Sequence, residues 1–591
     1  MSTERSDGPE NGLEVQTPRP LTNDTPGTGE DTEEIKPNDN EGEHPQTVSS
    51  SSISRTISKQ VSRISRMTGL SQTQTNTDLT TVPTEKYSVF TTAEKRIYVL
   101  MAAWIAFLSP LSSNIYTPAL ATIADDLHTT STLINLTVTT YLVFQGIAPT
   151  FIGAFSDSSG RRPAYLVAFF LYECACLGLA LQHSYAALLV LRCLQSAGSS
   201  GTVALAAGMV ADMVTSEERG SYVGYTQVVT LLGPSLSPII GGLLSQYLGW
   251  KSIFWFLFIF GGCLTVFCIL FLPETGRKVV GNGSIPPQKW NYSLSTHIRL
   301  RKLQKEGIYI DYEKRDELAR QRKLRFPNPL GTLKILFNKG PAIILFAVGW
   351  IFTCFMTVNV SMSELFKTNY GYDDVMVGVM YLPLGGAGII STFTTGRLQD
   401  WNYRRHAKKT GFPLSKNRQM DLTNFPIERA RLEIAFPFLI LACAGFIGFG
   451  WIMEAKTSVA GPVVMLAVIG YTVMSAFSCL SALIVDLYRD RAATATAANN
   501  LVRCLLGAAG TGFISPMIQA WGIGWACTFM SLVWLVIFPP FLVLLYYRGQ
   551  KWRQQDKQRK LERERNRQTP AKTEDGPDTE SDGQNNTQNS A

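Results

Sequence analysis

Two kinds of functional signature are missing from this sequence of 591 residues. No segment fits the Gly-x-x-x-x-Gly-Lys-Ser/Thr loop that binds nucleotide phosphates, and no paired catalytic residues stand in a soluble domain. ATP-driven transport and enzymatic catalysis are therefore not expected, and no cofactor is implied. The first 90 residues lack the apolar core of a cleavable signal peptide, so the first apolar segment is expected to direct membrane insertion itself.

The 10 cysteines show no metal-binding or redox pattern. All of them fall within apolar segments, and Cys174 and Cys176 would point to different faces of a helix. We interpret them as small buried side chains, and no metal site is expected.

Long apolar runs are what the sequence has in abundance. Hydrophobic residues make up 45% of it, and they gather in runs of about 20 residues, the length that crosses a bilayer. The pattern predicts an all-α membrane protein with twelve transmembrane helices in two pseudo-symmetric six-helix bundles. The first six spans are expected near 98–118, 132–153, 163–181, 186–211, 221–248 and 251–272. The second six are expected near 341–362, 375–395, 434–453, 461–485, 493–517 and 521–546.

An internal repeat supports the division into two bundles. The positions that recur at identical spacing are Gly153, Asp157, Arg161 and Arg162 in the first copy and Gly396, Asp400, Arg404 and Arg405 in the second. Each copy follows the second apolar segment of its half, as expected for a carrier that rocks one half against the other. Tyr403 stands where the first copy has Gly160, which implies a differently shaped turn.

Lysine and arginine gather in alternate connecting segments, so the positive-inside rule places both termini and the central loop in the cytoplasm. The expected parts are an N-terminal tail (1–94), an N-terminal bundle (95–272), a central loop (273–340), a C-terminal bundle (341–547) and a C-terminal tail (548–591). The net charge of +8 then reflects topology and attraction to anionic lipid, and no nucleic acid is expected as a partner.

The two tails are expected to be mostly disordered, because neither has enough apolar residues to fold alone. Within the first tail, residues 52–67 place apolar side chains on an arc of roughly 120° and basic side chains opposite, as in an amphipathic helix. One interpretation is a membrane-surface anchor that phosphorylation of its serines releases. The other is a serine-rich disordered tail.

Several motifs together resemble a known family. Gly153-x-x-x-Asp157-x-x-Gly160-Arg161-Arg162 is similar to the signature loop of the major facilitator superfamily. The span-five segment with Gly233, Pro234, Pro238, Gly241 and Gly242 is similar to the motif of its proton-coupled antiporters. The segments 108–120, 273–276 and 281–287 resemble the fungal twelve-span drug:proton antiporters, especially the quinidine-resistance and dityrosine-exporter branch. The resemblance extends over roughly residues 90–550 and implies the twelve-helix fold of that superfamily.

The signature loop predicts a conformational switch. Asp157 lies near the cytoplasmic end of span two, where a carboxylate accepts hydrogen bonds from a helix N-terminus or pairs with arginine. We expect it to latch one state of the carrier, with Arg161 and Arg162 either as partners or as topology determinants. The residues assigned to this switch are Gly153, Asp157, Gly160, Arg161, Arg162, Asp400 and Arg404.

Glycine and proline in span five predict a hinge or a seal between the halves. Pro234 and Pro238 each remove a helical hydrogen-bond donor, and Gly233, Gly241 and Gly242 allow close helix contact. Ordinary tight packing is the alternative interpretation. At the inner ends of the spans, two acid–arginine pairs predict a cytoplasmic gate: Asp212 with Arg219, and Asp486 with Arg491.

Charges inside spans indicate function by default. Arg192 resembles the family's buried arginine motif, which implies a part in proton coupling by tuning a carboxylate or binding an anionic group; a structural bond between helices is the alternative. Spans one, two, four and five have no Asp or Glu in their central parts. Glu173 in span three is the candidate proton carrier, with Asp157, Asp212 and Glu364 as alternatives.

Polar and aromatic side chains on inner-half helices are candidates for the substrate cavity. They are Asn114, Tyr116, Tyr141, Gln145, Gln195, Gln227, Asn359, Tyr381, Asn500 and Arg503. A mainly apolar cavity with few charges suits amphiphilic or weakly cationic molecules. Each of these side chains could equally serve in helix packing.

The sequence thus predicts a secondary active exporter that exchanges small molecules for protons by alternating access, as a monomer in the plasma membrane or an internal membrane. Three alternatives stay open. The first is a dedicated exporter of one metabolite, such as an amino acid, a weak acid, a polyamine or a spore-wall precursor. The second is an uncoupled facilitator, and the third is a membrane sensor that transports nothing.

Overall fold

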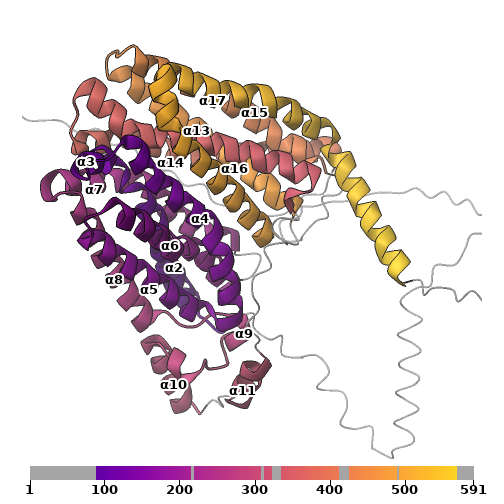
Figure 1. Cartoon of the computed structure of the whole chain (residues 1–591). Helices are drawn as coiled ribbons and strands as arrows, with labels where there is room; N and C mark the ends of the chain where they lie inside the picture. The colour runs from indigo at the N-terminus through magenta and orange to yellow at the C-terminus, as the bar shows by residue number, and fades with distance from the viewer. Residues whose placement is uncertain are drawn as a thin grey trace, which may run out of the picture. The chain divides into compact units, whose positions relative to one another are not determined.

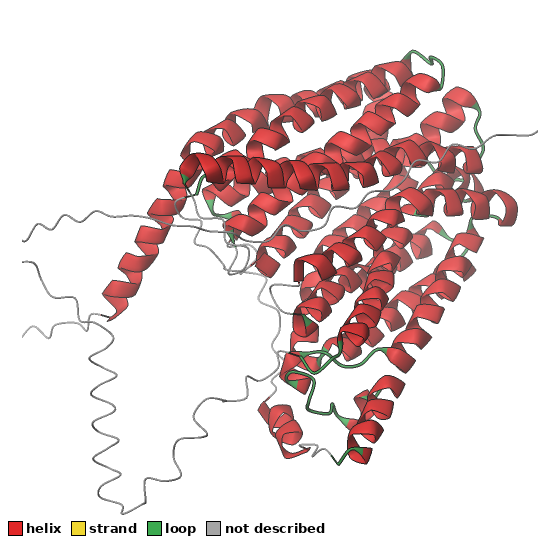
Figure 2. Cartoon of the chain, turned by 180° about the vertical axis from the view of Figure 1, so that it is seen from behind, coloured by secondary structure: helices red, strands yellow, loops and turns green. Residues whose placement is uncertain are grey.

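The computed structural model describes residues 88–214, 219–307, 312–321, 335–411, 425–488 and 492–568. The chain divides into two units, Met1–Thr84 and Glu85–Ala591, and only the second contains described residues. The amphipathic segment 52–67 therefore lies outside the described residues. Figure 2 shows helices joined by loops, with no strand in the described parts of the chain, which confirms the all-α class.

Each half of the chain contributes a series of long helices (Figure 1). The first half contains α2 (Thr92–Asn114), η1 (Thr117–Ala119), α3 (Leu120–Asp126), α4 (Ser131–Ser159), α5 (Arg161–Leu181), α6 (Tyr185–Met213), α7 (Arg219–Leu248) and α8 (Lys251–Phe271). The second half contains α13 (Lys339–Tyr370), α14 (Asp374–Thr410), α15 (Ile427–Glu454), α16 (Ala460–Leu487) and α17 (Ala492–Gln568). Between the halves lie α9 (Arg277–Val280), η2 (Lys289–Asn291), α10 (Leu294–Lys305) and α11 (Tyr312–Gln321).

Twelve of these helical segments have the length of a membrane span. Among the described residues, ten helices are long and apolar enough to cross a membrane. One of these ten is α17, although it contains two spans. Gly522, with φ 80°, divides α17 into two helices. The twelfth segment is α7, which has 30 residues and carries no charged residue after Arg219. The twelve-helix prediction is confirmed.

Local sequence explains where several helices begin and end. Thr91 and Glu94 form a reciprocal capping box at the start of α2, which satisfies backbone N–H groups that have no partner within the helix. Asp373 caps α14 by accepting a hydrogen bond from the Met376 amide. Gly371 and Gly411 end α13 and α14 in the left-handed conformation that glycine adopts without strain.

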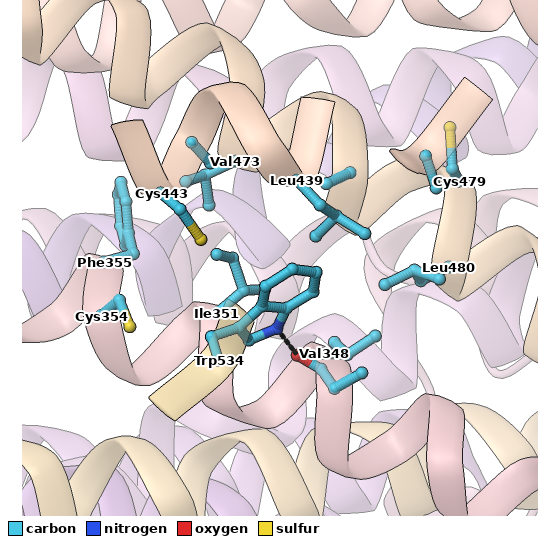
Figure 3. Packing of buried hydrophobic residues seen from close by; sticks show 14 of the residues in the cluster. Val348, Ile351, Cys354, Phe355, Leu439, Cys443, Val473, Cys479, Leu480 and Trp534 are labelled. Atoms are coloured by element: carbon cyan, nitrogen blue, oxygen red, sulfur yellow. Dashed lines mark hydrogen bonds between the residues drawn. The ribbon is translucent and has the colours of Figure 1, made fainter. Parts of the chain in front are cut away.

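Each half has its own hydrophobic core. In the first half α6 packs against α4 and α5, and α2 packs against α7; in the second half α13 packs against α17 and α16 against α14 and α15. Figure 3 shows the core of the second half around Trp534, which is fully buried. Its indole N–H donates to the Ala347 carbonyl at 3.3 Å, so the polar atom of this large side chain is satisfied.

The cysteines are free thiols, and most of them lie in these cores. Cys176 is buried whereas Cys174 is exposed, as their spacing on one helix predicts. Cys263 is also exposed, and Cys193 is half-buried. The expectation of buried side chains therefore holds for seven of the ten cysteines and is wrong for Cys174 and Cys263, which lie on the outer surface of the bundle.

The segment after α8 folds back onto the first half. The Val89 amide donates to the Asn282 carbonyl at 3.1 Å, and the Phe90 ring meets the Tyr98 ring edge-on at 5.5 Å. The Arg299 guanidinium covers the other side of this contact, 4.7 Å from the Phe90 ring centre. Burial lowers the pKa of Arg299, whereas Glu94 and Tyr98 act to raise it. The central connection therefore begins as an ordered extension of the first half.

Candidate functional site

The buried carboxylate of Asp374 joins the two halves at one end of the helices. It is 3% exposed and pairs with Lys367 Nζ of the second half at 2.6 Å. From the first half it accepts hydrogen bonds from Thr122 Oγ1 at 2.8 Å and from Ser245 Oγ at 2.5 Å. The Asp374 amide also donates to Gln246 Oε1 at 3.3 Å. We call this end of the helices the Asp374 end and the opposite end the Asp157 end.

Next to this cluster, α7 and α14 meet backbone to backbone. A Cβ on Gly242 would collide with the Asp374 carbonyl, and a Cβ on Gly378 would lie 2.6 Å from the Pro238 carbonyl oxygen. On the opposite side of α7, a Cβ on Gly241 would collide with the Ile115 carbonyl. The Gly-Pro segment of span five therefore lies in the seam between the halves, where only glycine fits at these positions. Its motion stays a prediction.

A second seam joins the middles of α4 and α17. The hydroxyls of Thr139 and Thr511 share a hydrogen bond of 2.9 Å. Nearer the centre, Asn500 Nδ2 donates to the Gln145 carbonyl at 3.0 Å. A Cβ on Gly146 would lie 3.0 Å from the Cys504 Cβ. Contacts between the halves thus extend from the Asp374 end to the middle of the helices.

At the Asp157 end, the ion pairs that the described residues form around Arg161 and Arg431 each lie within one half. In the first half Arg161 donates from Nη1 to Asp157 Oδ1 and from Nε to Asp212 Oδ2, both at 2.8 Å. Ser156 Oγ accepts a further bond from Arg161 Nη1 at 2.7 Å. The structure thus pairs Asp212 with Arg161; the side chain of its expected partner Arg219 lies outside the described residues.

The second half builds the same arrangement with a different arginine. Arg431 donates to Asp486 Oδ2 from Nη2 at 3.0 Å and to Gln399 Oε1 from Nη1 at 2.7 Å. Arg431 lies near the start of α15, as Arg161 lies at the start of α5. Gln399 precedes Asp400 as Ser156 precedes Asp157. The expected partner of Asp486, Arg491, lies outside the described residues.

The internal repeat therefore does not form two equal loops. Asp400 and Arg404 are exposed on α14, which continues as a helix to Thr410, and the position of Arg161 is taken by Arg431 instead of Arg404. A loop forms in the first half because Gly160 has φ 109°, a conformation that Tyr403 would adopt only with strain. Gly153 and Gly396 have open space around them, with nothing within 4 Å of a Cβ.

Glu274 holds this loop in place and was not among the predicted residues. Its side chain is 3% exposed and accepts hydrogen bonds from the Arg161 amide at 2.8 Å and the Arg162 amide at 3.2 Å, at the N-terminus of α5. The amides of Thr275 and Gly276 donate to it as well. A carboxylate is favoured at a helix N-terminus by the helix dipole. The motif Pro273-Glu274-Thr275-Gly276, which follows span six, was the sequence feature that could have indicated Glu274.

Arg162 serves the same junction and does not pair with Asp157. Its guanidinium donates to Asn291 Oδ1 at 3.0 Å and to the Ile269 carbonyl at 2.8 Å. Asn291 Nδ2 in turn donates to Glu274 Oε2 at 3.0 Å. Arg162 therefore ties the segment after α8 to the start of α5.

Near the middle of the first half, Arg192 lies between two tyrosine rings. Its guanidinium carbon is 4.3 Å from the ring centres of both Tyr116 and Tyr141, and the side chain is fully buried. Nη1 donates to Gln195 Oε1 at 2.6 Å. Nε and Nη2 have no hydrogen-bond partner among the described residues. The structure thus gathers three predicted cavity residues around Arg192.

Arg503 occupies an aromatic setting in the second half. It is half-buried, and its guanidinium carbon lies 5.1 Å from the Phe352 ring centre and 5.3 Å from that of Phe477. Nε and Nη2 donate to Asn500 Oδ1 at 3.3 and 3.0 Å. Through the bond from Asn500 to the Gln145 carbonyl, this group reaches the first half.

The remaining predicted residues make local contacts. Asn114 donates to the Pro110 carbonyl of its own helix at 2.8 Å, and the Tyr381 hydroxyl donates to the Asn359 carbonyl at 2.6 Å. The side chain of Gln227 lies outside the described residues. Glu173 is half-buried and packs against Gly261 of α8; its carboxylate has no hydrogen-bond partner in the described ranges. Substrate contact and proton transfer by these residues stay predictions.

Comparison with known proteins identifies the class of this fold. Residues 102–511 match the Major Facilitator Superfamily. The structure is similar to that of the xylose transporter XylE from E. coli in a partially occluded inward open conformation, with a TM-score of 0.53 and 13% sequence identity over 77% of this chain and 98% of that chain. The chain therefore belongs to the Major Facilitator Superfamily and is a membrane transporter.

Fungal relatives narrow the resemblance. The chain is 48% identical to the MFS-type transporter phiD of Fungal sp. (strain ATCC 74256), over 79% of this chain and 70% of the relative. It is 44% identical to the MFS-type transporter tstD of Talaromyces stipitatus, over 80% and 85%. It is 35% identical to the multidrug transporter QDR2 of Candida glabrata, over 80% and 83%. These relatives confirm the family that the motifs indicated.

The contact between α7 and the end of α2 gives a test of packing. We expect Gly241→Ala to lower the thermal unfolding temperature of the purified protein by several degrees, because the new methyl group meets the Ile115 carbonyl and overpacking typically costs about 1–3 kcal/mol. Gly262→Ala is the matched control, since nothing lies within 4 Å of a Cβ there. Scanning fluorimetry in detergent measures both, and equal unfolding temperatures would contradict the close contact.

Proposed function

We propose that this transporter exports amphiphilic small molecules in exchange for protons by alternating access. The observation that carries the proposal is the placement of charged contacts. At the Asp374 end a buried carboxylate bonds to both halves. At the Asp157 end, Arg161 and Arg431 keep their acidic partners within one half. This is the pattern of a carrier that is sealed at one end and ready to close at the other.

The charge distribution along the chain supports an orientation for this state. The Asp157 end is followed by the arginine-rich and lysine-rich segments of the central connection and the end of α17, so the positive-inside rule makes it cytoplasmic. The Asp374 end then faces outward. In this orientation the structure is an inward-facing state, with both termini in the cytoplasm and the monomer as the transporting unit. We assign it to the plasma membrane.

The name of one relative, a multidrug transporter, supports transport of small organic molecules. Proton exchange rests on the resemblance to antiporter motifs and on Glu173, a half-buried carboxylate with no hydrogen-bond partner in the described part of the chain. Arg192 is the second residue that we assign to proton coupling, because it resembles the family's buried arginine motif. A facilitator of the same fold is the second candidate, because the central parts of spans one, two, four and five hold no carboxylate.

Flux measurements test the transport mode. We expect at least one member of a panel containing a cationic drug, a polyamine, an amino acid and a weak acid to move through reconstituted vesicles faster when a pH gradient is imposed. Proton antiport predicts this acceleration because proton entry and substrate exit are coupled. Flux that ignores the gradient would favour the facilitator, and binding without flux would favour a sensor.

Asp157 is expected to be needed for transport and not for folding. It is 59% exposed on its side chain, and Arg161 would keep Asp212 as a partner without it. We expect Asp157→Asn to lower flux by roughly tenfold, equivalent to ~1.4 kcal/mol, with unchanged protein yield, because the Asp157 end could no longer be latched. Asp125→Asn, an exposed carboxylate at the other end, is the control. Undiminished flux would exclude the latch.

Asp374 is expected to hold the outer end closed. In Asp374→Asn the half-buried Lys367 ammonium loses its counter-charge, and removing the buried member of an ion pair is destabilising. We expect the outward-open fraction to rise about tenfold, or ~1.4 kcal/mol, measured as longer distances between spin labels at positions 125 and 456. Asp126→Asn is the control, because Asp126 bonds to Trp250 within the first half. Identical distance distributions would refute the role of Asp374 in closure.

A further inference from the structure

The charge of the helices that meet at the centre has one sign. These helices are α2, α4, α6, α7, α13, α14, α16 and the first part of α17, which contact the other half, carry Arg192 or Arg503, or lie next to their aromatic neighbours. The helix α5 also reaches this region, because Cys176 accepts a hydrogen bond from Gln195, but its one acid, Glu173, packs against Gly261 of α8 instead. Their apolar spans were predicted at 98–118, 132–153, 186–211, 221–248, 341–362, 375–395, 461–485 and 493–517. The charged residues that the sequence contains within those eight spans are Arg192 and Arg503, and none is acidic.

Arg192 lacks a counter-charge in a place where one is needed. It is fully buried, and two of its nitrogens find no acceptor among the described residues. Arginine does not relieve this by losing its proton, because its guanidinium stays protonated in proteins. A buried charge without a partner carries a large desolvation cost. The two tyrosine faces reduce that cost through cation–π contact but supply no negative charge.

Arg503 is the more accessible of the two cations. It is half-buried, and its hydrogen-bond acceptor in the structure is the neutral amide of Asn500. The rings of Phe352 and Phe477 flank it. A planar guanidinium between aromatic faces fits a carboxylate held by two parallel hydrogen bonds, with the apolar part of the same molecule against the rings.

Both arginines lie beside the same turn of α4. Arg192 packs on Tyr141, and the Asn500 that bonds to Arg503 donates to the carbonyl of Gln145. Tyr141 and Gln145 are four residues apart, so the two contacts lie about one turn apart along α4. The fields of the two cations therefore act on one region at the middle of the transporter. A cationic substrate would meet like charge there from both halves.

We propose that the substrate is an amphiphilic organic anion, whose carboxylate binds Arg503 and supplies the negative charge that Arg192 lacks. This inference rests on the proposed function as a transporter and replaces the weakly cationic substrate expected from the sequence. It also accounts for a centre without acidic side chains, because the cargo brings the carboxylate. An inside-negative membrane potential drives such an anion outward in the same direction as proton exchange.

Matched triplets of probes test the sign of the charge. Each triplet consists of a substituted succinate, its diamide and the corresponding diamine, on a phenyl, a naphthyl and a decyl scaffold. These molecules share their apolar part and differ in charge, and the succinates cross lipid slowly unaided. We expect the protein in reconstituted vesicles to carry one or more succinates roughly tenfold faster than the matching diamide and diamine, because only the succinate pairs with the guanidinium.

Two substitutions locate the binding group. Arg503→Gln is expected to reduce the preference for succinate over diamide by roughly tenfold, whereas Arg503→Lys keeps the positive charge and part of the preference. Lys302→Gln removes a positive charge from the exposed surface of α10 and is the matched control, with unchanged preference. Elution as a single species and the unfolding temperature show that each variant is folded. An unchanged preference in Arg503→Gln would overturn the assignment to Arg503.

The outcomes separate this inference from the transport function. Faster movement of a diamine or diamide than of its succinate overturns the anion proposal and leaves the transporter intact. If no member of any triplet moves, the anion proposal fails for these scaffolds, and flux of the cationic drug or the polyamine in the previous panel shows whether transport itself stands.

Discussion

A carboxylate withdrawn from water has to gather partners, and at Asp374 those partners come from both halves of the chain. Lys367 supplies the charge, and Thr122 and Ser245 supply hydrogen bonds across the seam. Because the cost of burial is offset only while all of them are present, the two halves are held together at this end. Gly242 approaches the Asp374 backbone at the same place, and at the opposite ends of the helices the described pairs of Arg161 and Arg431 lie within one half.

In each half, hydrogen bonds also join the start of the third long helix to the end of the sixth or to the segment just after it. The side chain that makes these bonds is an acid in the first half and an arginine in the second. In the first half the Glu274 carboxylate accepts from the backbone amides that begin α5. In the second half Arg553, near the end of α17, donates to the Phe425 carbonyl and to Glu428 at the start of α15. Both sets of contacts tie the third long helix of a half to the sixth or to the segment that follows it, as expected for halves that move as rigid bodies.

Sequence reasoning found the parts of this molecule that depend on local pattern. Apolar runs gave the helices, and the Gly-Pro segment was placed at a seam because small residues indicate close helix contact. It missed the contacts that depend on distant pairing. Asp374 meets Thr122 across 252 positions of the chain. Arg431 takes the role that spacing assigned to Arg404, because a continuous α14 carries Arg404 onto an exposed face.

The ends and the centre of the helices differ in how their charges are paired. At both ends of the helices, acids and bases are paired, and such pairs can exchange partners between halves as the carrier changes state. At the centre, Arg192 and Arg503 have aromatic faces and amides as neighbours, and the eight spans listed above contain no acid. A carboxylate of the protein at this place would neutralise the arginines in every state. A negatively charged substrate would then gain little binding free energy from them. An unmatched positive centre instead makes binding depend on the charge that the substrate brings, so affinity and selectivity have the same physical source.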